Sequence, residues 1–567
     1  MQPSRRTVLG GAAAGVVGSA TGFAAKKPGD GKGSTADVIL VGGDILTMDD
    51  RSTRASALAI AGERILAVGS RGDVMRHRGR STTVVDLSGR TVVPGLVDGH
   101  THAIRGGQTF RQETYWLDVT SLADGLARIR AAALSKPLDQ WVAVVGSWHP
   151  NQFRERRAPT VADLDAVSPD HPVYVQYLYD YALVNTAGAR VLGLDGTTPP
   201  APGIVVERDA AGRATGRLLG GVGPFNALVA RILPHTRAEG TASLAGYLRE
   251  LSRCGVTGVV DGSAGPAAAY LPLFALQDEG RLTVRVAYRV PAQVPGNESE
   301  FFEQLMQFRA PRTEDGFTPF VGIGEALVFG ANDGVRQSPG FVVSPEARAE
   351  LREVATFAAS RRLPLEVHAY TDDLASQILD AFEEVNATVP IRGLRWAMAH
   401  LNTGTARTIS RMRRLGMTYS VQMGPYFEAP TIAETNSLEV AQRSVARIAI
   451  DQGVTVGGGS DATRIGDYRV WPALQFHVTG TSLGGAVQRP RSQLLTRIEA
   501  LRMYTRGSTY LLFDEDDRGS LEPGKLADLA VLDRPYLTVP ATQIGAIRSV
   551  LTLVGGTPVH DAERQLT

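Results

Sequence analysis

His100 and His102, two histidines one residue apart, are the first side chains whose spacing suggests chemistry. They follow an apolar stretch over residues 92–97 that has the character of a short strand. Side chains two residues apart on an extended chain point to the same face, so both imidazoles can reach one metal ion. Barrel enzymes place their chemistry at the carboxyl ends of such strands. The pair therefore predicts a metal site that needs further ligands.

Other candidate ligands lie at or near the ends of further predicted strands, namely Glu325, His368, His400 and Asp461. The small residues before Asp461, in the run GGGSD, allow another group to approach closely. Six such groups suit two divalent ions, with Glu325 bridging them and a hydroxide held between. We expect zinc, and a single ion remains the alternative. For Glu325 the alternative is an ion pair with an arginine inside the barrel.

Composition narrows the class of protein. A chain of 567 residues with 43% hydrophobic content can bury a large core and should form two or more structural units. Its 59 basic and 58 acidic residues leave no net field to attract nucleic acid or an anionic membrane, so a nucleic-acid partner is not expected. The single cysteine, Cys254, excludes a multi-cysteine zinc site, which leaves His, Asp and Glu as ligands.

The first 25 residues are typical of a targeting segment. Arg5 and Arg6 precede a small apolar run over residues 10–25, which resembles a twin-arginine export signal. The run is too short and too rich in Gly and Ala for a stable membrane span. We expect the twin-arginine machinery to export the protein to the periplasm or the extracellular space, and leave open whether the signal is cleaved. Residues 26–35 form a polar linker.

Alternating strands and helices over residues 91–514 predict a (β/α)₈ barrel. Helical patterns occur at residues 347–360 and 405–415. The strands expected after the His100 strand are 255–261, 282–290, 320–329, 363–369, 395–401, 417–423 and 454–461.

Two further units are expected around the barrel. The long connection over about residues 105–253 contains strand-like segments at 141–148 and 173–183 and a hairpin around 208–213, and we interpret it as a lid over the barrel mouth. Short strands in residues 36–90 and 515–567 predict a small composite β-sandwich built from both ends of the chain.

These motifs together resemble the amidohydrolase superfamily, in particular amidohydrolase family 3, which includes N-substituted formamide deformylase-like proteins. The resemblance rests on PGLVDGHTH at residues 94–102, GSD at 459–461 and SLEPGKLADLAVL at 520–532, together with the lid, His368 and His400. It implies a metal-dependent hydrolase barrel and places the roles of the superfamily on His100, His102, His368, His400 and Asp461.

The chain departs from many relatives at three positions. Relatives often bridge their metals with a carbamylated lysine, where this chain has Glu325. They often carry a Glu before the sixth-strand histidine, where this chain has Ala399, and a His in the lid, where it has Tyr181. The last two changes predict altered substrate contacts.

The expected reaction is hydrolysis of an N-acyl, N-formyl or cyclic amide by a metal-activated hydroxide. Asp461 would serve as the proton shuttle. The residues expected to contact a small-molecule substrate are His149, Tyr181, Tyr370 and Arg464. The remaining histidines are expected to be structural or exposed, namely His77, His171, His235, His477 and His560.

Other functions compete with this interpretation. An esterase or lactonase would use the same machinery. A mononuclear deaminase is disfavoured because His368 is followed by AYTDD, without the glutamate that such enzymes use to shuttle protons. A non-catalytic barrel is disfavoured by the six candidate ligands. The sequence leaves open whether copies of the chain form a homo-oligomer.

Overall fold

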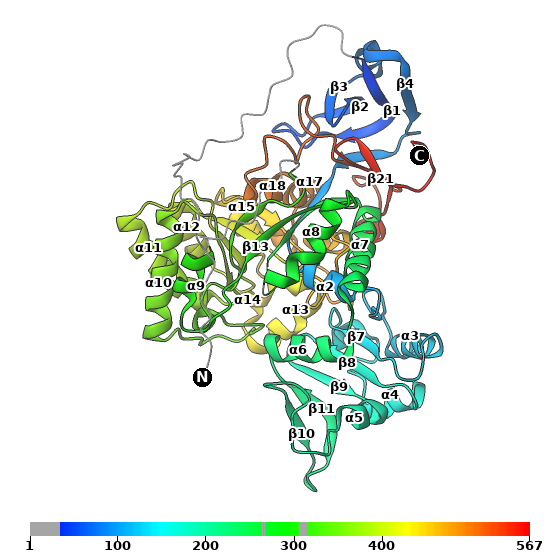
Figure 1. Ribbon diagram of the computed structural model, residues 1–567. Helices are drawn as coiled ribbons and strands as arrows, with labels where there is room; N and C mark the ends of the chain where they lie inside the picture. Colours follow the sequence, from blue (N-terminus) through cyan, green and yellow to red (C-terminus); the bar gives the residue numbers. More distant parts are fainter. Residues whose placement is uncertain (1–34, 263–264, 266, 306–315, 567) are drawn as a thin grey trace, which may run out of the picture. The chain divides into compact units, whose positions relative to one another are not determined.

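The computed structural model describes residues 35–262, 265, 267–305 and 316–566 (Figure 1). The predicted export signal at residues 1–25 and most of the linker therefore lie outside the described residues. In the part of the chain that is described, no helix combines the length and apolar character needed to cross a membrane.

Both ends of the described chain contribute to one eight-stranded sheet, in the order β21-β20-β19-β5-β1-β2-β3 with β4 beside β1. β1 pairs with β4 along its first half and with β5 along its second half, so the sheet branches there. One hydrogen-bonded network joins all these strands, and the β-sandwich expected from the sequence stays a prediction. They are β1 (Ala36–Leu46), β2 (Arg54–Ala61), β3 (Arg64–Gly69), β4 (Arg78–Asp86), β5 (Thr91–Pro94), β19 (Leu529–Leu532), β20 (Ser549–Val554) and β21 (Thr557–Asp561).

The strands that carry or precede the candidate ligands, together with the strands between them, form two four-stranded parallel sheets, β6-β12-β13-β14 and β15-β16-β17-β18. A bridge between Ile323 and Leu365 joins the sheets at one side. At the other side, the backbone N–H groups of Ser460 and Asp461 donate to the carbonyl oxygen of His100. This order is consistent with the predicted barrel. The strands are β6 (Leu96–Thr101), β12 (Val256–Asp261), β13 (Arg285–Val290), β14 (Phe320–Ile323), β15 (Glu366–Ala369), β16 (Ala397–His400), β17 (Thr418–Val421) and β18 (Val456–Gly458).

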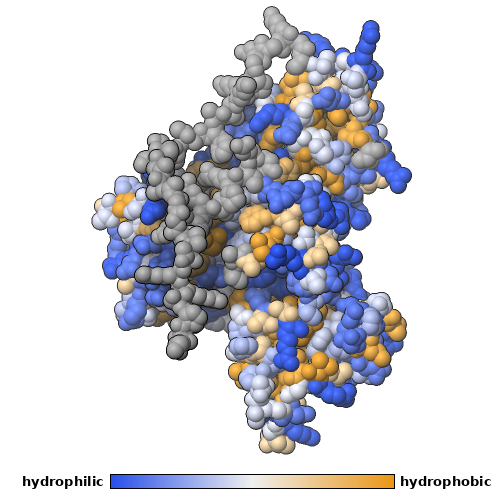
Figure 2. Space-filling view, viewed as in Figure 1, coloured by the Kyte–Doolittle hydropathy of each residue, from blue (hydrophilic) through white to orange (hydrophobic). Residues whose placement is uncertain are grey.

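Amphipathic helices lie between successive parallel strands. Helix α11 (Asp372–Thr388) buries Leu374, Ile378 and Phe382, a spacing that places all three on one helical face. Its exposed face carries Glu384, which pairs with Arg348 on α10 (Pro345–Ser360). Figure 2 shows a largely hydrophilic surface over these two helices. Other helices are α2 (Ala103–Thr109), α7 (Arg237–Arg253), α8 (Leu271–Asp278), α9 (Glu298–Leu305), α12 (Ala406–Leu415), α13 (Gly424–Thr435), α14 (Leu438–Gln442), α15 (Val445–Asp451), α16 (Trp471–Thr479), α17 (Arg497–Arg502) and α18 (Ser508–Leu511).

The connection predicted to be a lid folds around its own sheet, in the order β10-β11-β9-β8-β7 (cyan to green in Figure 1). Trp141, Tyr174 and Leu218 belong to its hydrophobic core. The expected hairpin joins β10 to β11. The elements are β7 (Val142–Val145), β8 (Val173–Tyr177), β9 (Tyr181–Val184), β10 (Val205–Arg208), β11 (Ala214–Leu219), α3 (Leu122–Leu134), α4 (Val161–Val167), α5 (Thr186–Leu192) and α6 (Val222–Ile232).

The segment predicted to be a lid, called the lid below, is attached to the loop that follows β18. The Ser147 hydroxyl donates to the carbonyl oxygens of Thr463 (2.6 Å) and Gly466 (2.9 Å). Arg464 forms an ion pair of 2.9 Å with Glu113, and their side chains are only 3% and 1% exposed. Arg464 was predicted to contact the substrate. In the structure it instead pairs with Glu113 and so links the loop after β18 to the lid.

Removing the charge of Glu113 should destabilise the fold. A Glu113→Gln variant leaves the Arg464 guanidinium buried without its counter-charge, a loss that typically costs about 3–5 kcal/mol. Urea unfolding should reveal this as a lower midpoint. The control is Glu439→Gln, which removes an exposed partner of Arg443 and should leave the midpoint nearly unchanged. Equal midpoints for wild type and Glu113→Gln would contradict the attachment.

Candidate metal centre

The structure brings all six predicted ligands together at the carboxyl ends of the parallel strands. His100 lies in β6 and His102 directly after the strand, while His368 lies in β15 and His400 ends β16. Glu325 and Asp461 come just after β14 and β18. The two carboxylates thus leave the hydrogen-bonded ladder, which explains why both strands are shorter than predicted.

Glu325 lies at the centre of the histidines. Its Oε1 is 3.4 Å from Nε2 of His102. Its Oε2 is 3.1 Å from both Nδ1 of His368 and Nε2 of His400, and 3.6 Å from Nε2 of His100. The alternative expected for Glu325 was an ion pair with an arginine, but these contacts are all with histidines. One carboxylate instead faces four imidazoles.

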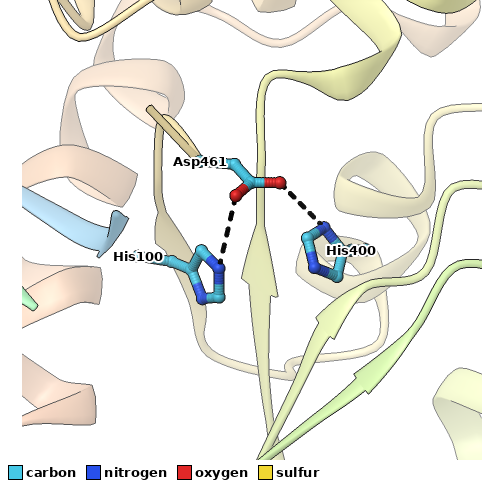
Figure 3. Close-up of side chains that lie close together, drawn as sticks. All are labelled: His100, His400 and Asp461. Carbon is cyan, nitrogen blue, oxygen red and sulfur yellow. Dashed lines mark ion pairs between the residues drawn. The ribbon is translucent and has the colours of Figure 1, made fainter. Parts of the chain in front are cut away.

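Asp461 approaches three of the same histidines from the last strand. Its Oδ1 is 3.1 Å from Nε2 of His102 and 3.8 Å from Nε2 of His100, and its Oδ2 is 3.7 Å from Nδ1 of His400. Figure 3 shows its carboxylate between His100 and His400. Asp461 therefore shares His100, His102 and His400 as neighbours with Glu325.

Backbone contacts hold the two carboxylates in place. The N–H of Glu325 donates to the carbonyl oxygen of Gly262, and the carbonyl oxygen of Glu325 accepts from the N–H of His368. Asp461 and His400 adopt left-handed backbone conformations, with φ of 57° and 69°. Such conformations cost roughly 1–3 kcal/mol and persist where surrounding contacts enforce them, often at functional sites.

Glycines allow the strands to approach one another at the site. A Cβ at Gly459 would lie 2.7 Å from Cβ of His100, and one at Gly324 (φ +122°) would lie 2.0 Å from the carbonyl oxygen of Glu366. The predicted reason for the small residues before Asp461 is therefore correct. The close neighbour is the backbone of the His100 strand.

Sequence reasoning missed two carboxylates behind the histidines. Glu366 Oε1 is 2.5 Å from Nδ1 of His100, and Asp333 Oδ1 is 3.3 Å from Nε2 of His368. Glu366 left a signal, because it lies two residues before His368 and so shares its inward face. Asp333 lies in a loop, where no periodicity marks it.

The electrostatic environment of the site favours the charged form of Glu325. Burial would raise the pKa of Glu325, but the imidazoles of His100, His368 and His400 hold that pKa well below its usual range. Burial would lower the pKa of His100, but Glu366, Glu325 and Asp461 outweigh it and raise that pKa to about 10. The site is thus a set of buried anions that strongly attract positive charge.

The donor set fits a divalent cation. Three groups of side chains each offer ligand atoms within 4.8 Å of one another. Nε2 of His100 is buried and forms no hydrogen bond with any described residue, although it points at two carboxylates. Imidazole and carboxylate ligands suit zinc. The groups are His100 with His400 and Asp461, His100 with His102 and Glu325, and Glu325 with His368 and His400.

The predicted substrate contacts differ in their surroundings. The Tyr370 ring stacks on His400 at 4.5 Å between centroids. Nδ1 of His149 accepts from the N–H of Asn151, and its Nε2 lies 2.9 Å from the Thr431 hydroxyl of α13. Burial lowers the pKa of His149 to about 4, so the ring is neutral at neutral pH. The half-buried Tyr181 in the lid packs under Arg217 at 4.4 Å.

The other histidines have partners away from this centre. His171, His235 and His560 each contact a backbone carbonyl oxygen. His477 is buried in α16, and His77 ends a short 3₁₀ helix. None of the five belongs to a described group that could hold a metal ion.

Comparisons with known proteins agree with this architecture. The model of the amidohydrolase family matches residues 83–560. N-substituted formamide deformylase of Arthrobacter pascens is 25% identical over 562 residues, covering 92% of this chain and 97% of the relative. The putative amidohydrolase YtcJ of Bacillus subtilis is 24% identical, covering 92% and 98%.

A solved structure supports the fold. An uncharacterized metal-dependent hydrolase from Pyrococcus horikoshii superimposes with a TM-score of 0.65 at 22% identity, covering 89% of this chain and 99% of that one. Because the family match spans well over half of the sequence, the chain belongs to the amidohydrolase family.

Proposed function

We propose that this protein is a metal-dependent hydrolase that cleaves an amide or related C–N bond, in a (β/α)₈ barrel flanked by the sheet of the two chain ends. The observation that carries the proposal is the position of Glu325, whose two oxygens face the imidazoles of His100, His102, His368 and His400. A carboxylate so placed suits a bridge between two divalent ions, which we propose to be zinc.

Metal ions held there would polarise a carbonyl oxygen and lower the pKa of a coordinated water from about 15.7 toward about 7. His100 and His102 with Asp461 would hold one ion, and His368 with His400 the other. Glu325 belongs to both sets. The protein itself would hold these side chains in a fixed geometry. It would also leave the site open to the substrate carbonyl at the carboxyl ends of the strands.

Asp461 is the proposed proton carrier. This role is supported by the contacts of both carboxylate oxygens with the candidate ligands and by the burial of the residue, which is only 3% exposed. It would take one proton as the water oxygen bonds to the amide carbon. It would then donate that proton to the leaving nitrogen as the C–N bond breaks. Amide and water thus give a carboxylic acid and an amine.

The substrate class is proposed from the relatives and the reaction type. A relative spanning nearly the whole chain is named as an N-substituted formamide deformylase, so N-formyl and N-acyl amides come first, followed by cyclic amides. Tyr370 is the substrate contact we retain, because its ring lies against His400. Esters and lactones remain the second candidate class, because the same machinery attacks either carbonyl.

Metal content is the first test. The proposal predicts more than one divalent ion per chain by elemental analysis of the purified protein. A His100→Ala variant should lose metal and hydrolysis together, whereas His171→Ala, at a histidine outside the described metal-binding groups, should keep both. Full activity with a single ion would contradict the bridging role of Glu325.

Asp461→Asn tests the proton carrier. Metal-replete enzyme is first screened on N-formyl, N-acyl and cyclic amides, esters and lactones, and the best substrate is kept. Because general acid–base catalysis contributes typically 10²–10⁴-fold, kcat of the variant should fall by at least about a hundredfold while most metal remains. A rate within a few-fold of wild type assigns the proton to another group. Hydrolysis of esters alone would overturn the amide proposal.

We also propose export by the twin-arginine route, which rests on the sequence alone. Arg5 and Arg6 precede the apolar run, and this route carries folded proteins, which suits an enzyme that binds metal before export. Replacing both arginines with lysine should retain the protein in the cytoplasm of the expressing cell, as fractionation would show. Unchanged export of the double variant would refute this proposal.

A further inference from the structure

We infer that Glu366 and Asp333 are positioning residues that hold two histidines of the site independently, one for each metal ion. Glu366 orients His100, and Asp333 orients His368. The inference rests on the proposed two-ion site and adds a support to each half of it.

Glu366 fixes the ring of His100 from inside the barrel. It lies in β15, two residues before His368, and both Glu366 and His100 are fully buried. With Nδ1 of His100 bound to Glu366 Oε1 at 2.5 Å, only Nε2 can face Glu325 and Asp461. A carboxylate behind a metal-binding histidine fixes the tautomer and orientation of the ring and strengthens it as a ligand.

Arg289 explains how Glu366 can be charged in this place. Barrel interiors are usually filled by branched aliphatic side chains, and an unpaired buried charge is costly. Nη1 of Arg289, in β13, lies 3.5 Å from Oε2 of Glu366, and both side chains are at most 2% exposed. Arg289, Glu366 and His100 thus form a line of groups from three strands that ends at the proposed metal.

Asp333 supports His368 together with the backbone carbonyl of the next residue, Gly334. The Asp333 carboxylate accepts hydrogen bonds from the N–H groups of Tyr370 and Thr371 and from the Thr371 hydroxyl, which fix its position. Nε2 of His368 lies 3.3 Å from Asp333 Oδ1 and 2.7 Å from the carbonyl oxygen of Gly334. The His368 ring therefore turns its Nδ1 toward Glu325. His100 faces Glu325 with its other ring nitrogen, Nε2.

The two supports share no residue. In the proposed two-ion site, Glu366 contacts a ligand of the first ion, His100, and Asp333 contacts a ligand of the second, His368. Glu325 belongs to both ligand sets. Loss of one support should therefore loosen one ion and leave the other. Since such outer partners typically contribute 10–100-fold to metal affinity, the difference is measurable.

The experiment compares Glu366→Gln and Asp333→Asn with wild type, all loaded with Zn²⁺ and titrated with a chelator while bound zinc is counted. We expect one of the two ions to dissociate at about 10–100-fold lower chelator concentration in each variant, with the second ion unchanged. Loading with Co²⁺ gives a second readout. The visible absorption of the two variants should differ from wild type and from each other, because different sites are perturbed.

Asp528→Asn is the matched control for lost stability. Asp528 forms a buried ion pair of 3.0 Å with Arg285, in the same strand as Arg289 but facing the sheet of the chain ends. This variant should unfold at lower temperature yet keep the wild-type chelator profile. Should Glu366→Gln fail to fold, Glu366→Asp replaces it, because it keeps the charge beside Arg289 while moving the carboxylate away from His100. The same selective loss is expected.

The outcomes separate this inference from the proposed function. Two ions in wild type, with unchanged chelator profiles in both variants, would overturn the positioning roles. Loss of both ions together in either variant would overturn their independence. One ion in wild type would refute the two-ion proposal, and the positioning roles would then be decided by whether either variant weakens that ion.

Discussion

The attraction between the Glu325 carboxylate and the four surrounding imidazoles is the interaction on which the site depends. A buried carboxylate is stable only with opposite charge or hydrogen-bond donors around it, and Glu325 has His100, His368 and His400 within 3.1–3.6 Å of one oxygen. These side chains come from separate strands. The Glu325 carboxylate keeps these partners only if the strands keep their observed positions relative to one another. The geometry of the candidate site therefore depends on how the strands pair.

Glycines allow the backbones to approach closely enough for this arrangement of the strands. Gly459 lies against the His100 strand and Gly324 against the Glu366 carbonyl, and in both places a Cβ would overlap its neighbour. At the same edge of the sheets, His400 and Asp461 adopt left-handed backbone conformations. Parallel strands that are buried on both faces and covered by helices provide a large apolar core. The packing of this core offsets the free-energy cost of the left-handed conformations.

The sequence predicted the parallel strands and the six candidate ligands that the structure brings together, because both leave local signals. Apolar runs of strand length recur between helical patterns, and a histidine or acidic residue ends several of them. It did not predict Asp333, because that residue acts through a loop far along the chain from His368. Nor did it predict the role of Arg464, since an arginine after a catalytic strand can face a substrate or a distant glutamate, and only the folded lid supplies Glu113.

The loop after β18 both carries Asp461 and contacts the segment predicted to be a lid. Asp461 begins it, and within the next five residues Thr463, Arg464 and Gly466 receive the lid through Ser147 and Glu113. Because these contacts are buried and partly ionic, the lid cannot shift at this point without disturbing the backbone that aims Asp461. One short loop therefore couples the position of the predicted lid to the position of the Asp461 carboxylate.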